Sequence, residues 1–219
     1  MKANRTSLYP TDALSERIAD GTVHAIGVLG ALTGAVMLIV WSAFNATPAQ
    51  IAAIAVYGAA LIATFAASAL YHLVPWEGAR PLLRRVDHAA IYLKIAGTYT
   101  PLVVIIGHWF AYLVLAVVWT LAVIGMVLKL FFWRAPGRFG PLLYLVMGWL
   151  SLALVWSLWT VVPLSAMVLI AVGGLLYTAG VPFHVTHTMK YSTAIWHGFV
   201  LAASGCFFAA IWIGSAGLG

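Results

Sequence analysis

The chain has 219 residues, of which 64% are hydrophobic and 7% are charged. A composition this apolar excludes an ordinary soluble domain and indicates an integral membrane protein. The net charge of +6 reflects membrane topology rather than nucleic-acid binding, and the single cysteine, Cys206, excludes an intrachain disulfide and a cysteine-rich zinc site.

The N-terminal residues 1–21 are polar and predict a cytoplasmic segment ahead of a single transmembrane domain, 22–219. They lack the short apolar stretch and small-residue cleavage site of a signal peptide, so we expect the first apolar segment to direct its own insertion. Seven apolar stretches follow, separated by turn-forming or charged residues. The expected spans are 22–42, 51–74, 87–106, 111–132, 141–160, 164–183 and 193–214.

Each stretch has about 20 residues, the length that an α-helix needs to cross roughly 30 Å of hydrocarbon. Backbone groups in lipid must be hydrogen-bonded within the protein, and the alternating pattern of strands is absent, so helices are expected. The sequence therefore predicts an all-α integral membrane protein built as a bundle of seven transmembrane helices.

The positions of Lys and Arg predict the orientation of this bundle. Apart from Lys94, these residues lie before the first span or at the connections that follow the second, fourth and sixth spans. Positive residues accumulate on the cytoplasmic side of membrane proteins. The pattern predicts a multi-pass protein of the cell's inner membrane, with a cytoplasmic N-terminus and an extracytoplasmic C-terminus.

Ionisable and polar side chains from four expected spans reach the cytoplasmic edge. Taken singly, each has an ordinary interpretation: a histidine near a helix end is often interfacial or hydrogen-bonded, and Asp87 can complement a helix dipole or pair with Arg84. Their coincidence at one depth favours a shared site. The residues are Ser68 and His72 on the second span, Asp87 on the third, His197 on the seventh, and Glu16 and His24 near the first.

Two histidines and a carboxylate are a ligand set that suits zinc, so His72, His197 and Asp87 are the candidate metal ligands. A catalytic zinc ion keeps one position open for a water molecule, whose pKa it lowers towards neutrality. Asp87 would act as general base or orient that water. Ser68, one turn from His72, would hold a substrate oxyanion or orient the water.

Glu16, His24 and Lys94 are expected around this set rather than within it. Lys94 follows Asp87 by seven residues and therefore lies about 10 Å deeper in the membrane. It is expected to face a polar cavity or the headgroup of an acyl chain, or to snorkel to the interface. His184 and His187 at the end of the sixth span are expected to be a solvated pair that can lend a ligand.

The sequence resembles the haemolysin III family, the bacterial branch of the progestin and adipoQ receptor (PAQR) proteins. The resemblance covers most of the chain and implies a seven-helix, receptor-like bundle with its N-terminus inside. It rests on Glu16 with His24, on SALYH at 68–72, on DHAAIYLKIAGTYTP at 87–101 and on AIWHGFV at 194–200.

The family pattern is Ser-x-x-x-His on the second helix, Asp at the start of the third, and His-x-x-x-His on the seventh. Carried over by position, it implies roles for Ser68, His72, Asp87 and His197. Members of the wider superfamily, which includes alkaline ceramidases, look like zinc-dependent hydrolases of lipid amides. In the receptor members three histidines bind the zinc ion and the aspartate acts through a water molecule.

This chain departs from the pattern at Thr193, which replaces the first histidine of the seventh-helix pair. A neutral hydroxyl is a poor zinc ligand. Three alternatives follow: Asp87 becomes a direct ligand; His184, His187 or His24 supplies the missing ring; or zinc binding is weakened or lost.

Several functions are consistent with these observations. The first is a zinc-dependent membrane hydrolase that acts on a lipid amide or ester. The second is a non-enzymatic sensor of membrane lipid, or a receptor-like protein, that takes part in membrane homeostasis. A cytolytic pore fits less well, because seven apolar helices with little internal charge do not resemble a water-filled channel. The expected partners are membrane lipid and a small lipid-like substrate or ligand, and the oligomeric state stays open.

Overall fold

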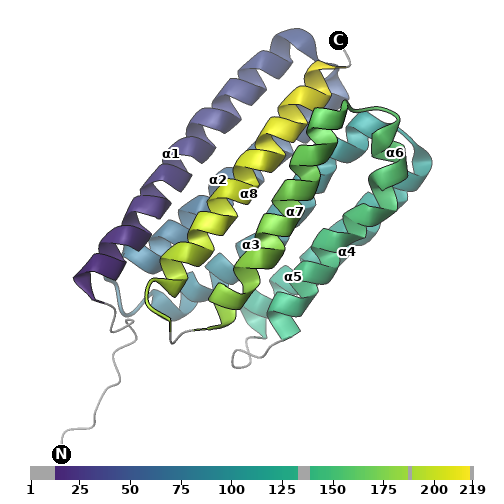
Figure 1. The fold of residues 1–219 in the computed structure, drawn as a ribbon. Helices are drawn as coiled ribbons and strands as arrows, with labels where there is room; N and C mark the ends of the chain where they lie inside the picture. The colour runs from purple at the N-terminus through teal and green to yellow at the C-terminus, as the bar shows by residue number, and fades with distance from the viewer. Residues whose placement is uncertain (1–12, 133–138, 187–188, 218–219) are drawn as a thin grey trace, which may run out of the picture.

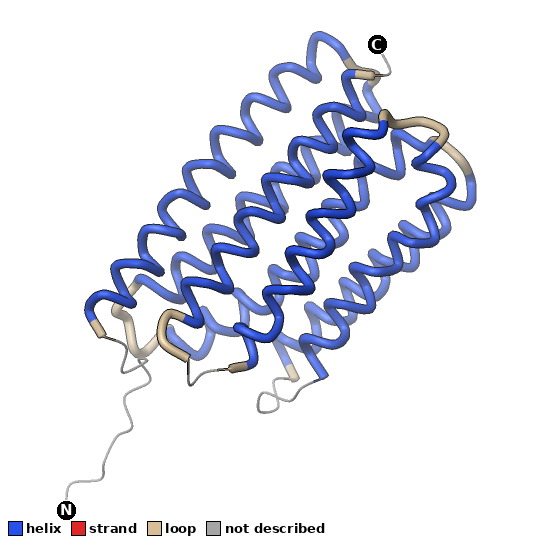
Figure 2. The backbone as a smooth tube through the Cα atoms, viewed as in Figure 1, coloured by secondary structure: helices blue, strands red, loops and turns tan. Residues whose placement is uncertain are grey.

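The computed structural model describes residues 13–132, 139–186 and 189–217, and within these ranges every regular element is a helix (Figures 1 and 2). The prediction of an all-α fold is therefore confirmed for this part of the chain. The helices are α1 (Leu14–Asn45), α2 (Pro48–Leu73), α3 (Arg80–Ile106), α4 (Trp109–Phe131), α5 (Phe139–Trp149), the 3₁₀ segment η1 (Leu150–Leu154), α6 (Val155–Trp159), α7 (Leu164–Val185) and α8 (Ser192–Ala216).

The helices form one elongated bundle whose neighbours along the chain pack side by side. Helices α1 to α4 pack pairwise in order, α7 packs on α8, and α8 returns against α1 and α3. The start of α1 and the end of α8 lie at opposite ends of the bundle (Figure 1). This arrangement places the starts of α1, α3 and α8 and the end of α2 at the same end of the molecule.

Six of these helices are long and apolar enough to cross a membrane: α1, α2, α3, α4, α7 and α8. The single helix expected over 141–160 is instead divided among α5, η1 and α6. A tertiary contact accompanies the break: the Tyr99 hydroxyl lies 2.8 Å from the carbonyl oxygen of Met147 and 2.9 Å from that of Gly148. Carbonyls released by a change of helix type in an apolar region need such a donor.

Two helices begin earlier than the apolar pattern indicated. Helix α1 begins at Leu14 rather than at residue 22, and α3 at Arg80 rather than at residue 87. Glu16 accepts a hydrogen bond from the backbone amide of Ala13 at 3.0 Å, and Pro81 occupies the first turn of α3, where a missing N–H costs nothing. Hydropathy marks the part of a helix suited to lipid, whereas the helix itself continues through polar turns.

Small residues allow α2 to approach its neighbours closely. A Cβ atom added to Gly97 of α3 would lie 2.5 Å from the Ala60 side chain, and one added to Gly27 of α1 would lie 2.5 Å from the Phe65 ring. Such contacts admit only glycine without a shift of the helices. They hold α1, α2 and α3 in the close packing on which the site below depends.

Candidate metal centre

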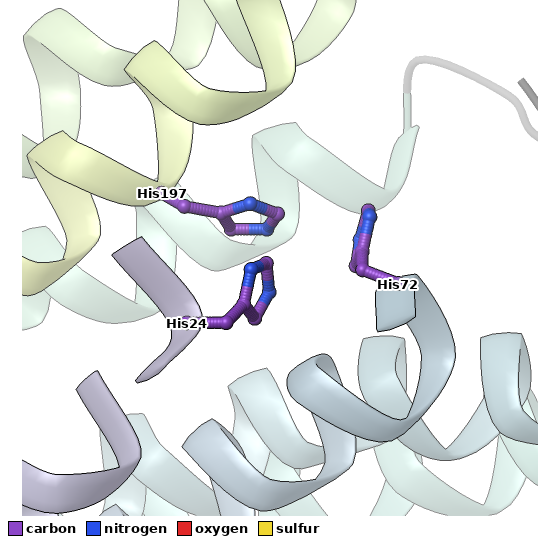
Figure 3. A group of neighbouring side chains, drawn as sticks. All are labelled: His24, His72 and His197. Atoms are coloured by element: carbon purple, nitrogen blue, oxygen red, sulfur yellow. The ribbon is translucent and has the colours of Figure 1, made fainter. Parts of the chain in front are cut away.

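Three histidines from three helices meet near one end of the bundle. His24 of α1, His72 of α2 and His197 of α8 each offer a nitrogen atom, and these atoms all lie within 4.8 Å of one another. Figure 3 shows the three rings facing a shared space. The ring centroids of His24 and His197 are 4.3 Å apart, those of His72 and His197 4.6 Å, and those of His24 and His72 5.1 Å.

One carboxylate, that of Asp20, faces all three rings. Its Oδ1 lies 2.7 Å from Nδ1 of His197 and 3.5 Å from Nδ1 of His24, and its Oδ2 lies 3.4 Å from Nδ1 of His72. The backbone oxygen of Asp20 lies a further 2.8 Å from Nδ1 of His24. Because the Nδ1 atoms are engaged on this side, the Nε2 atoms are the ones left to bind a metal, as in carboxylate–histidine–metal sites.

The role of Asp20 is the main feature that sequence reasoning missed. Asp20 lies in the sequence at the same expected membrane edge as His24, but the predicted site does not include it. The available signal was its spacing of four from His24, which places both side chains on one face of α1. Asp20 is only 8% exposed and His24 only 2% exposed, so both face the interior of the bundle.

Ser68 and Asp87 lie beside the histidines. The Ser68 hydroxyl oxygen is 3.2 Å from Nε2 of His24 and 3.5 Å from Nε2 of His197, so it sits on the side where a metal would bind. The Asp87 carboxyl group interacts with the Ser68 hydroxyl and lies within electrostatic range of His197. The group of converging ligand atoms contains three histidines and not Asp87, which the structure places next to Ser68.

In the structure His24 supplies a third ring beside His72 and His197. Thr193 lies in the first turn of α8, partly buried and one turn before His197. The ring of His184 instead packs 4.7 Å from that of Trp196, and His187 lies outside the described residues. Of the alternatives that the sequence left open, the geometry favours His24 as the third ring.

Glu16 connects the start of α1 to the start of α8. Its Oε1 accepts a hydrogen bond from the backbone amide of Tyr191 at 2.8 Å, while its Oε2 accepts the one from Ala13. Tyr191 has a φ of +62°, a left-handed conformation that is unfavourable for a residue with a side chain. Glu16 thus fixes the entry into α8, and with it the position of His197 relative to His24.

The donor set fits a divalent transition-metal ion. Neutral imidazole is the most common ligand for such ions, and three of them leave room for a further ligand. Metal–nitrogen bonds are about 2.0–2.1 Å long, so the rings need only small side-chain movements to converge on one ion. The buried carboxylate of Asp20 adds the negative charge that a divalent cation needs in an apolar setting.

Similarity to known proteins extends over most of the chain. A family model described as "Haemolysin-III related" matches residues 14–208. Hemolysin-3 of Bacillus cereus is 33% identical over 90% of this chain and 91% of its own length, and a Hemolysin-3 homolog of Bacillus subtilis (strain 168) is 33% identical over 89% and 92%. The monocyte to macrophage differentiation factor of Homo sapiens is 28% identical over 90% of this chain and 83% of its own length.

Proposed function

Because this chain belongs to the haemolysin III family, we propose that it is a zinc-dependent hydrolase that acts on an amide or ester bond of a membrane lipid. The observation that carries the proposal is the convergence of His24, His72 and His197 around the buried carboxylate of Asp20. Structural zinc sites fill all four ligand positions with protein atoms, whereas catalytic sites use three and leave one for water or substrate. Three rings match the catalytic arrangement.

The proposal includes a seven-span topology in the cell's inner membrane. The α5–η1–α6 segments supply the seventh crossing, since their apolar stretch runs over 143–159 between α4 and α7. The basic residues Arg17, Arg84, Arg85 and Lys190 lie at the same end of the bundle as the histidines. By the positive-inside rule that end, and the N-terminus with it, is cytoplasmic.

Each residue then has a defined task. A zinc ion held by the three histidines would supply Lewis acidity, which polarises a carbonyl group and makes water acidic. Asp20 holds the rings through their Nδ1 atoms and compensates positive charge. Ser68 donates a hydrogen bond to the oxygen of the substrate carbonyl, where negative charge develops during attack. Asp87, beside Ser68, accepts the proton of the attacking water and returns it to the amine or alcohol that leaves when the C–N or C–O bond of the substrate breaks.

A non-enzymatic lipid sensor is the second candidate, and one observation favours it. A cavity of the described residues is lined by Lys94 but by none of the three histidines. A lipid held there would be bound without reaching the candidate metal centre. Binding and turnover therefore have to be measured separately.

The test combines metal content with turnover. We expect about one zinc ion per detergent-purified chain by elemental analysis, and release of a fatty acid or alcohol from a panel of lipid amides and esters. Asp87→Asn should retain zinc and lose turnover by at least about 100-fold, in line with the loss of an acid–base group. Glu77→Gln, a change of an exposed loop carboxylate, is the matched control and should alter neither.

Two results would overturn the proposal. Wild-type protein without zinc, purified in the absence of chelators, would remove the metal centre. Zinc at full occupancy without turnover on any lipid of the panel would leave the metal and favour the sensor.

A further inference from the structure

Four basic side chains from three helices lie close together near the end of the bundle that holds the candidate metal centre. This basic cluster consists of Arg84 and His88 near the start of α3, Lys129 near the end of α4 and His184 near the end of α7. The ring centroids of His88 and His184 are 6.1 Å apart. Arg84 and Lys129 lie within electrostatic range of His88 and of each other. None of the four belongs to the group of histidines that converges at the metal centre.

A hydrogen bond joins α3 to α4 beside the cluster. Arg84 and His88 are four residues apart and therefore share one face of α3. The Nη1 atom of Arg85 donates a hydrogen bond to the carbonyl oxygen of Leu130 at 3.2 Å. Arg85 follows Arg84 in the chain, and Leu130 follows Lys129. This bond therefore fixes the two helices where the guanidinium and ammonium groups of the cluster come together.

The two histidines of the cluster are held by aromatic neighbours. The Tyr144 hydroxyl of α5 donates a hydrogen bond to the backbone oxygen of His88 at 3.1 Å. The ring of His184 packs 4.7 Å from that of Trp196 on α8. All four members of the cluster are partly buried, so water and salt screen their charges less than those of exposed residues.

Positive charge exceeds negative charge in this part of the bundle. The described residues contain four carboxylates, those of Glu16, Asp20, Glu77 and Asp87. The first two contact the start of α8 and the metal-centre histidines, and the third lies in the exposed loop before α3. Asp87 lies within electrostatic range of Arg84 but interacts with the Ser68 hydroxyl. Its single charge does not balance both Arg84 and Lys129, so an anion bound between them would offset their repulsion.

The donors of the cluster suit a phosphate group. A guanidinium group presents a planar fork of N–H donors that fits phosphate oxygens, an ammonium group adds three donors, and each imidazole adds an N–H. A phosphate monoester carries about −1.5 to −2 charges at neutral pH and three strong acceptor oxygens, whereas a carboxylate carries a single charge and two oxygens. Two cations and two rings from three helices therefore match phosphate better than carboxylate.

We propose that the basic cluster binds a phosphate monoester group, with Arg84 and Lys129 supplying positive charge and His88 and His184 supplying further N–H donors. A soluble phosphate compound and the terminal phosphate of a phospholipid headgroup present this same chemistry to the cluster. The site is independent of the proposed hydrolase, because none of its four members is a metal ligand.

Equilibrium dialysis of the detergent-purified chain with radiolabelled inorganic phosphate, at constant ionic strength, tests the site. Wild-type protein should bind phosphate saturably, and a large excess of acetate should not displace it. His24→Ala, which removes a candidate metal ligand, should bind phosphate as wild type does. Displacement of the label by acetate as readily as by unlabelled phosphate would overturn the proposal, and so would the absence of saturable binding. Neither comparison needs a variant to fold.

Variants of the cluster locate the anion. Lys129→Met should weaken phosphate binding at least about tenfold, since it removes a charged donor, whereas Lys129→Arg should retain most of the affinity. His184→Phe keeps a ring beside Trp196, removes the N–H donors and should also weaken binding. Lys190→Met is the matched control, because it removes the same charge at the same end of the bundle but outside the cluster. Equal weakening by Lys129→Met and Lys190→Met would reveal non-specific attraction and refute the site.

Nanodiscs distinguish the two sources of phosphate. Wild-type protein is placed in phosphatidylcholine discs with and without phosphatidic acid, whose headgroup ends in a phosphate monoester. Competition between phosphatidic acid and labelled phosphate would support the cluster as a headgroup site, and unchanged binding would support a soluble ligand. Phosphate binding that is lost both in His24→Ala and in wild type treated with a zinc chelator would place the anion on the metal and would contradict the proposal.

Discussion

The carboxylate of Asp20 contacts the Nδ1 side of three imidazole rings, so this one residue sets the orientation of every candidate metal ligand. Asp20→Asn keeps the shape of the side chain but removes its charge and one of its two acceptor oxygens. Loss of such an outer partner typically lowers metal affinity about 10- to 100-fold. We expect a loss in this range, measured by competition with a chelating dye. Unchanged affinity would show that Asp20 does not orient the rings.

His24 and Thr193 provide a test of which side chain completes the ligand set. His24→Ala should abolish stoichiometric zinc binding, since two rings remain. Adding Thr193→His to that variant should restore zinc, because residues 193 and 197 lie four apart on one face of α8. Elemental analysis of the single and double variants measures both effects. Zinc retained at full occupancy in His24→Ala would contradict the assignment of His24.

At the scale of elements, Glu16 holds the starts of α1 and α8 together through the backbone amide of Tyr191. Glu16→Gln weakens this tie because a neutral amide is a poorer acceptor than a carboxylate. We expect a lower melting temperature in detergent and a smaller loss of zinc affinity than Asp20→Asn causes, since Glu16 acts only through the placement of α8. The exposed Glu77→Gln is the control and should leave both unchanged. A melting temperature equal to that of wild type would rule out a structural role for this tie.

The interruption of the fifth expected span is a feature that the local sequence does not predict. The stretch 141–160 is uniformly apolar and reads as one helix. The break at Trp149 and Leu150 coincides with the approach of the Tyr99 hydroxyl to two carbonyls, a contact that joins residues almost fifty positions apart. The hydropathy of 141–160 contains no sign of a hydroxyl donor from another helix. The apolar pattern could therefore indicate a membrane crossing but not the break in its helix.

At the scale of the whole molecule, the proposed orientation can be measured with cysteine labelling. Cys206 is the single native cysteine, so Cys206→Ser provides a background without thiols. On intact cells a membrane-impermeant maleimide should label His108→Cys, which lies between α3 and α4, and should label Glu77→Cys only after permeabilisation. The opposite pattern would place the candidate metal centre on the outer side of the membrane.

The sequence by itself determined the class of protein, six long apolar helices and the end of the bundle near which His24, His72, Asp87 and His197 lie. It could do so because hydropathy, helix length and charge distribution act through the bilayer, which treats each segment almost independently. The position of Ser68 beside the histidines could likewise be inferred from its spacing of four from His72, whereas its catalytic role stays a prediction.

Only the tertiary structure decided which side chains face one another. The packing of α8 against α1 brings His24 and Asp20 close to His197. Asp87 lies beside Ser68 instead. Lys94 lines an apolar cavity to which none of the three histidines contributes. Depth along a membrane normal follows from position in the chain, whereas rotation of each helix about its axis follows from packing against its neighbours. The rotation of a helix cannot be predicted from the sequence of that helix alone, and the rotation of α1 is what makes His24 a candidate ligand.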